Sequence, residues 1–374
     1  MPSVKPPYEN FANIKVVGVG GSGNNVVTYM TSTKARNVEL IAMNTDAQDL
    51  HAAQAHKKLR LGKDLTRGLG AGMDPAVGRR AAEESREEIA AHVKDADMVF
   101  VTGGLGGGTC SGAAPIIAEL AKKNGALTVA IVTLPFAFEG HQRTRIATEA
   151  WNELRKNVDA IVTIENDKLL DTIDRKTSLL SAFRAANDIL KNAVLGISDV
   201  ITVPGLINVD FADMRTIMAD SGIAILGLGR AVGEGKAVQA AKAAISSPLV
   251  DASMEGARGI LFTVTGSKDL GMQDVNEIAK AITESADPEA RIIFGALVDR
   301  SLRKNEVRVT VIATGLSEKI GKEGQREPLV VADSMRDEAE FTAQPRVQVY
   351  KEGEQQQEED PFEVPSFLRR RLKR

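Results

Sequence analysis

Short apolar runs alternate with amphipathic stretches along the first half of the chain. The runs have the length and β-branched content of buried strands, and they lie at Ile14–Val19, Leu40–Met43, Met98–Thr102, Thr128–Thr133 and Ala160–Ile164. Stretches with helical spacing lie between them, at Pro75–His92, Gly112–Lys123 and Gly140–Lys156. This alternation predicts an α/β domain with a mostly parallel, Rossmann-like sheet and helices on both of its faces.

A longer helical pattern follows and separates this unit from a second one. Residues Leu179–Val203 carry apolar side chains at helical spacing, and Pro204-Gly205 is a stop signal. The second unit has strand candidates at Ile223–Leu228, Ile260–Val264, Ile292–Leu297 and Val307–Ile312, and helix candidates at Lys236–Ala244 and Asp274–Glu284. Four strands and few helices predict a second, smaller α/β sheet domain.

The two ends of the chain are polar. Residues 1–10 are predicted to be a disordered arm, and residues 317–360, rich in Glu, Gln, Lys and Asp, a disordered linker. Residues 361–374 combine apolar side chains with five basic residues at the end, which suits either a docking peptide or an unstructured basic end. The expected domains between them are 11–178, a central helix at 179–203, and 204–316.

The composition of the chain argues against several classes of protein and of binding site. The net charge of −3 argues against a nucleic-acid-binding protein. One cysteine, Cys110, allows no intramolecular disulfide, and four scattered histidines give no credible zinc site. No signal peptide and no apolar run of about 18 residues are present, so we expect a soluble, cytoplasmic protein.

Two glycine-rich loops each follow a predicted strand and precede a helix. Glycine lets the backbone approach an anion closely, and the helix N-terminus adds a partial positive charge. The first candidate set is Gly20, Gly21, Ser22, Gly23, Asn24 and Asn25, and the second is Gly106, Gly107, Gly108, Thr109 and Cys110.

The second loop is the more specific signal. Six glycines between Gly103 and Gly112 cost about 0.5–1 kcal/mol each in ordered structure, more than a plain turn requires. The first loop matches the dinucleotide fingerprint G-x-G-x-x-G at Gly18, Gly20 and Gly23, but no acidic residue ends the second strand. Two alternatives therefore remain for the first loop. It can be a glycine turn that binds no ligand, or it can bind the cofactor of a nicotinamide-dependent oxidoreductase. Neither loop is a P-loop.

The second loop resembles the signature of the tubulin family, and the chain from about residue 13 to 316 is similar to the bacterial tubulin homologue FtsZ. The matching stretches are Gly106–Gly112, Asn44–Gln48, Leu65–Gly72, Pro135–Gly140, Gly205–Asp213 and, in the tail, Pro365–Arg369. Cys110 departs from the family, which has glycine there. At a helix N-terminus we expect the pKa of this thiol to fall, and its alkylation to block nucleotide binding.

The resemblance implies that the nucleotide is GTP, which is hydrolysed to GDP and phosphate. It places Asn166, Phe183 and Asn187 at the guanine, Glu139 at the ribose, Arg143 at the sugar or phosphates, and Asn44 and Asp46 in the same crevice. Local patterns also allow simpler roles: Phe183 as a core aromatic, Glu139 and Arg143 as a helical salt pair, and Gly68–Gly72 as a plain surface loop rather than a mobile γ-phosphate sensor.

The resemblance assigns catalysis to Asn208, Asp210 and Asp213, which would complete the site of the next subunit and polarise the attacking water. An ordinary helix cap is the local alternative for the two aspartates. Mg²⁺ bridging the phosphates would have a shell of phosphate oxygens and water, so no protein metal ligands are expected.

Such a protein would polymerise head to tail, hydrolyse GTP on assembly, and form the cytokinetic ring at mid-cell. Its tail would bind a membrane-tethering adaptor of the FtsA, ZipA or SepF kind, so that membrane contact is indirect; direct contact of the basic tail with anionic lipid is an alternative. The competing functions are the oxidoreductase above and a nucleotide-binding scaffold with little hydrolysis.

Overall fold

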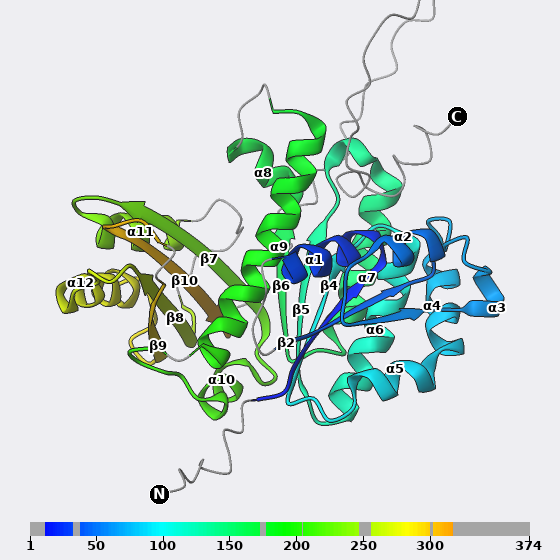
Figure 1. Ribbon diagram of the computed structural model, residues 1–374, viewed down its shortest axis with the longest axis horizontal. Helices are drawn as coiled ribbons and strands as arrows, with labels where there is room; N and C mark the ends of the chain where they lie inside the picture. Colours follow the sequence, from blue (N-terminus) through cyan, green and yellow to red (C-terminus); the bar gives the residue numbers. More distant parts are fainter. Residues whose placement is uncertain are drawn as a thin grey trace, which may run out of the picture.

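Ten strands form one continuous sheet, in the order β3-β2-β1-β4-β5-β6-β7-β10-β8-β9 (Figure 1). The computed structural model describes residues 12–32, 38–172, 177–203, 205–246, 256–299 and 302–316. The strands are β1 (Ile14–Val19), β2 (Val38–Asn44), β3 (Lys57–Arg60), β4 (Met98–Gly104), β5 (Leu127–Leu134), β6 (Ala160–Glu165), β7 (Gly222–Val232), β8 (Gly259–Gly266), β9 (Arg291–Val298) and β10 (Glu306–Thr314). Only the pairs of β10 with β7 and with β8 are antiparallel.

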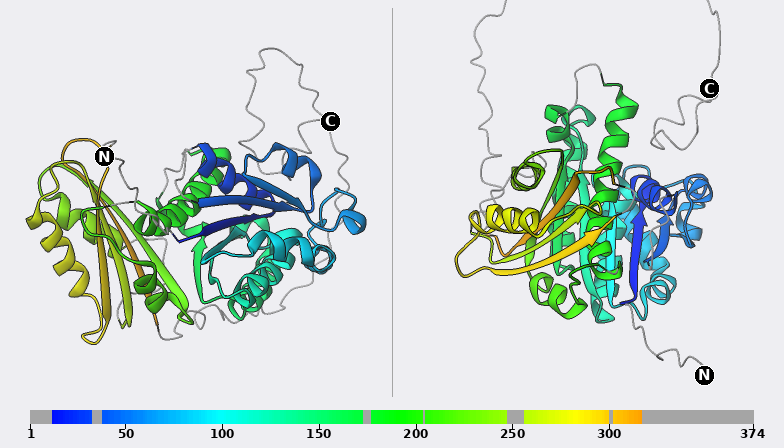
Figure 2. Two further views of the ribbon diagram at one scale, coloured as in Figure 1. Left: turned by 60° about the horizontal axis from the view of Figure 1, so that its bottom comes forward. Right: turned by 60° about the vertical axis from the view of Figure 1, so that its left-hand side comes forward.

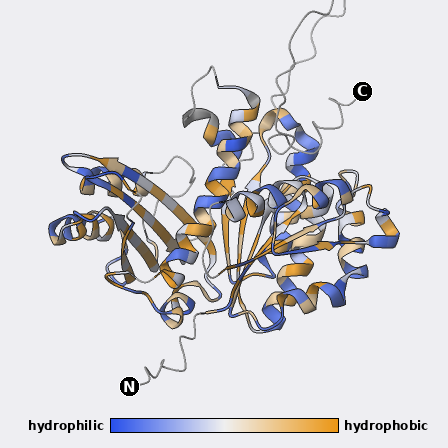
Figure 3. Cartoon of the chain, viewed as in Figure 1, coloured by the Kyte–Doolittle hydropathy of each residue, from blue (hydrophilic) through white to orange (hydrophobic). Residues whose placement is uncertain are grey.

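Helices cover the sheet on both faces. They are α1 (Gly20–Ser32), α2 (Ala47–Ala52), α3 (Lys63–Thr66), α4 (Pro75–Glu84), α5 (Arg86–Val93), α6 (Gly108–Lys123), α7 (His141–Arg155), α8 (Asn166–Thr172), α9 (Leu179–Thr202), α10 (Phe211–Met218), α11 (Lys236–Ile245) and α12 (Met272–Thr283). The strands in the middle of Figure 3 are hydrophobic, whereas the outer helices turn hydrophilic faces to solvent. The predicted fold class is therefore confirmed.

The alternation of side chains along β1 shows how the two layers arise. Val17 and Val19 point into the core formed with α4, α5, α6 and α7, whereas Ile14 and Val16 point into the core formed with α1 and α9. All four are fully or almost fully buried, as expected of a parallel strand covered on both faces.

Helix α9 stands between the two halves of the molecule, as Figures 1 and 2 both show. Its buried side chains share one core with β1 and β5 of the first half and with β7, β8 and β10 of the second. The strands of the two halves are also joined directly, because Ala160, Ile161 and Val162 of β6 pair with β7. A separate core lies under α11 and α12 on the other face of the second half.

Two predicted helices differ from the structure by more than one or two residues at an end. The stretch predicted as one helix at Pro75–His92 is two helices, divided at Ser85, whose backbone leaves helical geometry and whose buried hydroxyl accepts a hydrogen bond from Gly62 N (3.0 Å). Helix α6 begins at Gly108, four residues before the predicted start, so the second glycine loop is shortened to Leu105–Gly107.

The predicted arm at 1–10, the linker at 317–360 and the docking peptide at 361–374 lie outside the described residues. Within the described part of the chain, no helix has the length and apolar content to cross a membrane.

Candidate functional site

A cavity of about 520 Å³ opens where the parallel strands of the first half end. Strands β1, β2, β4 and β5 contribute Val19, Asn44, Gly104 and Thr133 at or near their last residues. In an open parallel sheet, ligands bind in the crevice outside these carboxyl ends. The N-terminal part of α9 closes one side of the cavity with Phe183, Ala186 and Asn187.

Both glycine loops line this cavity. Gly20 (φ 70°) and Gly106 (φ 98°) have left-handed backbone that favours glycine. Gly107 has ordinary extended backbone (φ −95°, ψ 177°), but a Cβ added there would meet no atom within 4 Å, so the space beside it is open. Directly after it, α6 presents its unpaired N–H groups, as an anion site requires.

The sequence-predicted loop residues divide into two groups. The lining residues are Gly20, Gly21, Ser22, Asn25, Gly107, Gly108, Thr109 and Cys110. Gly23, Asn24 and Gly106 do not line the cavity. A Cβ on Gly23 would lie 2.5 Å from Thr102 O, so this glycine allows α1 to pack against β4. Asn24 is buried, and neither of its side-chain polar atoms has a hydrogen-bond partner among the described residues.

The predicted base-reading residues converge at one end of the cavity. Asn166 begins α8 and is buried, and its Oδ1 has no partner within the described chain. Phe183 and Asn187 lie one turn apart on α9. The Phe183 ring meets Phe136 edge to face at 5.5 Å, so Phe183 belongs to an aromatic cluster and also lines the cavity. A buried amide oxygen without a partner suits the N–H groups of a ligand.

Glu139 and Arg143 form an ion pair on one side of the cavity, and both line it. Glu139 Oε1 also accepts a hydrogen bond from Phe136 N (3.0 Å). Arg143 extends towards Met73, with 3.9 Å from its Nη2 to Sδ. The pairing expected from their spacing is therefore present and lies at the cavity.

Asn44 and Asp46 also line the cavity. Asn44 is buried, its Oδ1 accepts a bond from Asp46 N (3.2 Å), and its Nδ2 has no partner among the residues described. Asp46 caps α2 by accepting from Gln48 N (2.9 Å). Sequence reasoning did not select Thr45, between them, whose hydroxyl lies 2.6 Å from that of Thr109. The only signal for it was its place in the Asn44–Gln48 motif.

The loop between α3 and α4 forms the mouth of the cavity through Leu69–Met73, so all of the predicted Gly68–Gly72 loop except Gly68 lines the cavity. Its backbone is left-handed at Arg67, Gly68, Gly70, Gly72 and Met73. It is bonded to the segment after β2, since Ala47 N donates to Gly68 O (3.0 Å) and Gly70 N donates to Thr45 O (3.3 Å). Leu69 is nevertheless 74% exposed.

The prediction of a lowered pKa for the Cys110 thiol is wrong. The side chain is buried in the core beneath α6, and burial raises the pKa of the thiol to about 12 instead of lowering it. Its sulfur points towards Gly103: a Cβ added to Gly103 would lie only 2.6 Å from Cys110 Sγ. Cys110 does not have a positive φ, so the backbone accommodates a side chain where the family has glycine.

This burial predicts a slowly reacting thiol. At pH 8, a pKa of about 12 leaves roughly one thiol in ten thousand as thiolate, the nucleophilic form. The native protein should therefore react with a disulfide reagent on the order of a thousandfold more slowly than the chain unfolded in denaturant. A similar rate in both states would show that Cys110 is accessible in the native fold.

Asn208, Asp210 and Asp213 lie away from the cavity. They follow the C-terminal end of α9, which lies beside α10 in Figure 1, whereas the cavity is lined by Phe183, Ala186 and Asn187 in the N-terminal part of that helix. Asp210 caps α10 through Asp213 N (2.7 Å), and Asn208 Oδ1 accepts from Gly205 N (2.6 Å). Asp213 is exposed, and its carboxylate makes no hydrogen bond or ion pair within the described part of the chain.

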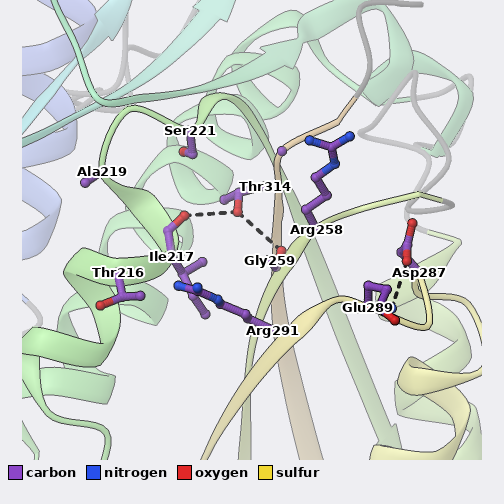
Figure 4. A pocket seen from close by; sticks show the side chains of 11 residues that line it. Thr216, Ile217, Ala219, Ser221, Arg258, Gly259, Asp287, Glu289, Arg291 and Thr314 are labelled. Carbon is purple, nitrogen blue, oxygen red and sulfur yellow. Dashed lines mark hydrogen bonds between the residues drawn. The ribbon is translucent and has the colours of Figure 1, made fainter.

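A second cavity, of about 580 Å³, lies between α10 and the ends of β8 and β10 (Figure 4). Thr314 Oγ1 donates to Ile217 O (3.1 Å) or Gly259 O (3.3 Å) and so links α10 to the second half of the sheet. Two arginines and two carboxylates share its lining, so its charge is mixed. None of the predicted site residues line it.

The family model for the GTPase domain of the Tubulin/FtsZ family matches residues 13–174, and that for the C-terminal domain of the FtsZ family matches residues 222–317. Among solved structures, an empty FtsZ dimer of M. jannaschii is 46% identical, covering 81% of this chain and 88% of that chain, with a TM-score of 0.79. A mutant of FtsZ from M. jannaschii is 45% identical, with coverage of 82% and 92% and a TM-score of 0.79.

A GTPgS-bound CetZ2 protofilament from Haloferax volcanii is 22% identical, covering 83% of this chain and 95% of that chain, with a TM-score of 0.71. That likeness shows the shared fold alone. The two family models and the identity to FtsZ, over more than four fifths of the chain, show that this chain belongs to the FtsZ family of GTP-binding, GTP-hydrolysing cytoskeletal proteins.

Proposed function

We propose that this GTPase binds GTP in the 520 Å³ cavity and polymerises head to tail, and that each GTP is hydrolysed at the junction with the next subunit. The observation that carries this proposal is the separation of the two predicted half-sites along α9. From Asn187, the last residue of α9 that lines the cavity, to the end of the helix at Thr202 is about 22 Å, so a carboxylate beyond that end cannot act on a nucleotide in its own subunit. It can act on one bound by a neighbour.

The cavity supplies the parts that GTP requires. The glycine loops and the start of α6 would bind the phosphates, with Arg143 beside the sugar or phosphates and Glu139 at the ribose. Asn166 and Asn187 would bind the guanine edge, and Phe183 would stack on the base. The buried polar atoms of Asn44 and Asn166 that lack partners among the described residues, and the open space beside Gly107, support this assignment. In this proposal residues 11–178 are the nucleotide-binding domain and 204–316 the activating domain, joined by the central helix at 179–203.

Exposed apolar side chains support the contact between subunits. Leu69 (74% exposed) and Phe138 (58%) lie at the cavity end, and Leu206 (68%) lies beside Asn208 at the other end. A contact between two different faces does not close on itself and therefore builds filaments. The FtsZ dimer and the CetZ2 protofilament among the similar structures are self-assembled forms of relatives.

The chemistry of the junction is mainly placement and charge. Asp213, with Asp210 and Asn208, would orient and polarise the water that attacks the γ-phosphate in the neighbour's cavity. Bound Mg²⁺ would neutralise phosphate charge, held mostly by phosphate oxygens and water. Loss of the γ-phosphate then weakens the contact that it helped to form.

The cellular role follows from the family. We propose that the filaments form the cytokinetic ring at mid-cell, in the cytoplasm, and that residues 361–374 dock on a membrane-tethering adaptor of the FtsA, ZipA or SepF kind. The five basic residues in the last six positions give that segment a charged face for such a partner.

Sedimentation of the full chain with Mg²⁺ and GTP, GDP, ATP or NAD tests the proposal. We expect a pellet with GTP and little with the other three, and phosphate release that rises more steeply than protein concentration. A chain ending at residue 360 should pellet equally, because the tail is assigned to the adaptor. A protein that binds NAD and stays in the supernatant with GTP would contradict the proposal, whereas a stable GTP-bound pellet without phosphate release would favour a scaffold.

A further inference from the structure

Thr45 connects the two sides of the cavity although it is fully buried. It lies between β2 and α2, and its Oγ1 is 2.6 Å from the Oγ1 of Thr109, which is 64 residues away in sequence and lies in the first turn of α6. Thr109 is half-buried and lines the cavity, whereas Thr45 does not. One hydroxyl of this pair can therefore reach a ligand, and the other can reach it only through its partner.

The protons of this pair are not independent. Between the two hydroxyls alone, either can donate to the other. A phosphate oxygen only accepts hydrogen bonds, so a Thr109 hydroxyl that contacts phosphate must direct its single proton there. Thr109 Oγ1 can then only accept from Thr45, and Thr45 becomes the donor. The short contact thus holds Thr109 in the orientation in which it donates to the ligand.

The backbone of Thr45 binds the loop at the cavity mouth. Its carbonyl accepts a hydrogen bond from Gly70 N (3.3 Å), and Thr66 Oγ1, which can donate to Gly62 O (2.9 Å), lies 3.3 Å from the same carbonyl. The neighbouring Asp46 forms a β-bridge with Leu69, the most exposed apolar residue of that loop. A displacement of Thr45 therefore reaches both the phosphate side of the cavity and the exposed loop.

We propose that Thr45 is a positioning residue: its hydroxyl orients the Thr109 hydroxyl towards the phosphates of the bound nucleotide, and its backbone links that orientation to the Leu69 loop. This inference rests on the proposed binding of GTP in the cavity. It assigns a role in nucleotide affinity to a side chain that never touches the nucleotide.

Replacing Thr45 with valine tests the hydroxyl while keeping the shape of the side chain. We expect about tenfold weaker GTP binding for the full chain, measured by titration with fluorescent GTP, because Thr109 loses its fixed orientation. Thr45→Ser, which keeps the hydroxyl, should restore affinity to within about threefold of the wild type. Urea unfolding of each variant shows whether the fold is retained.

A double-mutant cycle separates positioning from a general effect on structure. If Thr45 acts through Thr109, then Thr45→Val should cost little or nothing further in a Thr109→Val background. Thr128→Val is the matched control, because it removes a fully buried hydroxyl that bonds Ala126 O at the start of β5, away from the cavity, and leaves the Thr45–Thr109 contact intact. Its affinity should stay within about twofold of the wild type.

The outcomes distinguish the two proposals. Wild-type protein that binds no guanine nucleotide would overturn the proposed function. Wild-type protein that binds GTP, together with a Thr45→Val variant of unchanged affinity or with additive effects in the cycle, would overturn the role of Thr45 alone.

Discussion

Replacing Asp213 with alanine is expected to lower GTP turnover by about 100- to 10,000-fold while leaving GTP affinity unchanged. The carboxylate is exposed and has no side-chain partner within the described residues, so its loss removes no contact that holds the fold. The cavity lies at the other end of α9 and is not altered. Phosphate release per subunit and equilibrium GTP binding are the two measurements.

Two further variants at α10 test whether the loss of turnover is specific to the carboxylates. Thr216→Ala is the matched control, because its hydroxyl bonds only the backbone of α10, at Ala212 O, and turnover should stay near that of the wild type. Asp210 needs a different substitution, since its Oδ1 caps α10. Asp210→Asn keeps that cap and removes the charge, whereas alanine there would also cost about 1 kcal/mol of stability.

The assignment to the neighbouring subunit has its own test. Mixing Asp213→Ala protein with a variant that cannot bind GTP should recover part of the turnover, because some junctions then combine an intact cavity with an intact α10. Turnover that Asp213→Ala leaves unchanged, or a mixture as inactive as its components, would argue against hydrolysis between subunits.

Replacing Gly107 with alanine is expected to weaken GTP binding by about 10- to 100-fold without destabilising the protein. The backbone there is extended, which any residue adopts, and the added methyl group meets no atom within 4 Å in the empty cavity. The same methyl group would occupy the space in which the phosphates are proposed to lie, and overpacking typically costs 1–3 kcal/mol. GTP titration and urea unfolding measure the two effects.

Gly112→Ala, five residues further along the chain and inside α6, is the contrasting variant. A Cβ there would lie 2.2 Å from Pro75 O and 2.4 Å from Arg79 N, so α4 and α6 could no longer pack closely. We expect this variant to lose stability first and GTP binding only as a consequence.

Normal GTP affinity in the Gly107 variant would show that the phosphates do not approach that glycine.

The sequence predicted the sheet strands well because buried parallel strands are continuous apolar runs, as at Ile14–Val19. It could not predict the division of α4 from α5, since the hydrogen bond from Gly62 to Ser85 joins residues 23 positions apart. The continuity of the sheet likewise depends on pairing between β6 and β7, which no local pattern encodes.

In the candidate site too, contacts between distant segments could not be predicted from the sequence. Family motifs indicated most of the cavity lining, but the burial of Cys110 and the contact of Thr45 with Thr109 arise only when distant segments pack together. A helix N-terminus predicts a low thiol pKa only where the sulfur points to solvent or to the exposed amides; the core position of Cys110 reverses the sign.

The length of α9 has a consequence for the dimensions of the assembly. If each subunit places its cavity at one end of this helix and Asp213 near the other, then successive nucleotides along a filament are separated by a distance that this helix largely sets. Each residue of α9 contributes about 1.5 Å, so removing four residues would draw the two ends together by roughly 6 Å and rotate the residues beyond the deletion by about 40°. In the proposed filament, the axial repeat would then depend largely on this one helix of 24 residues.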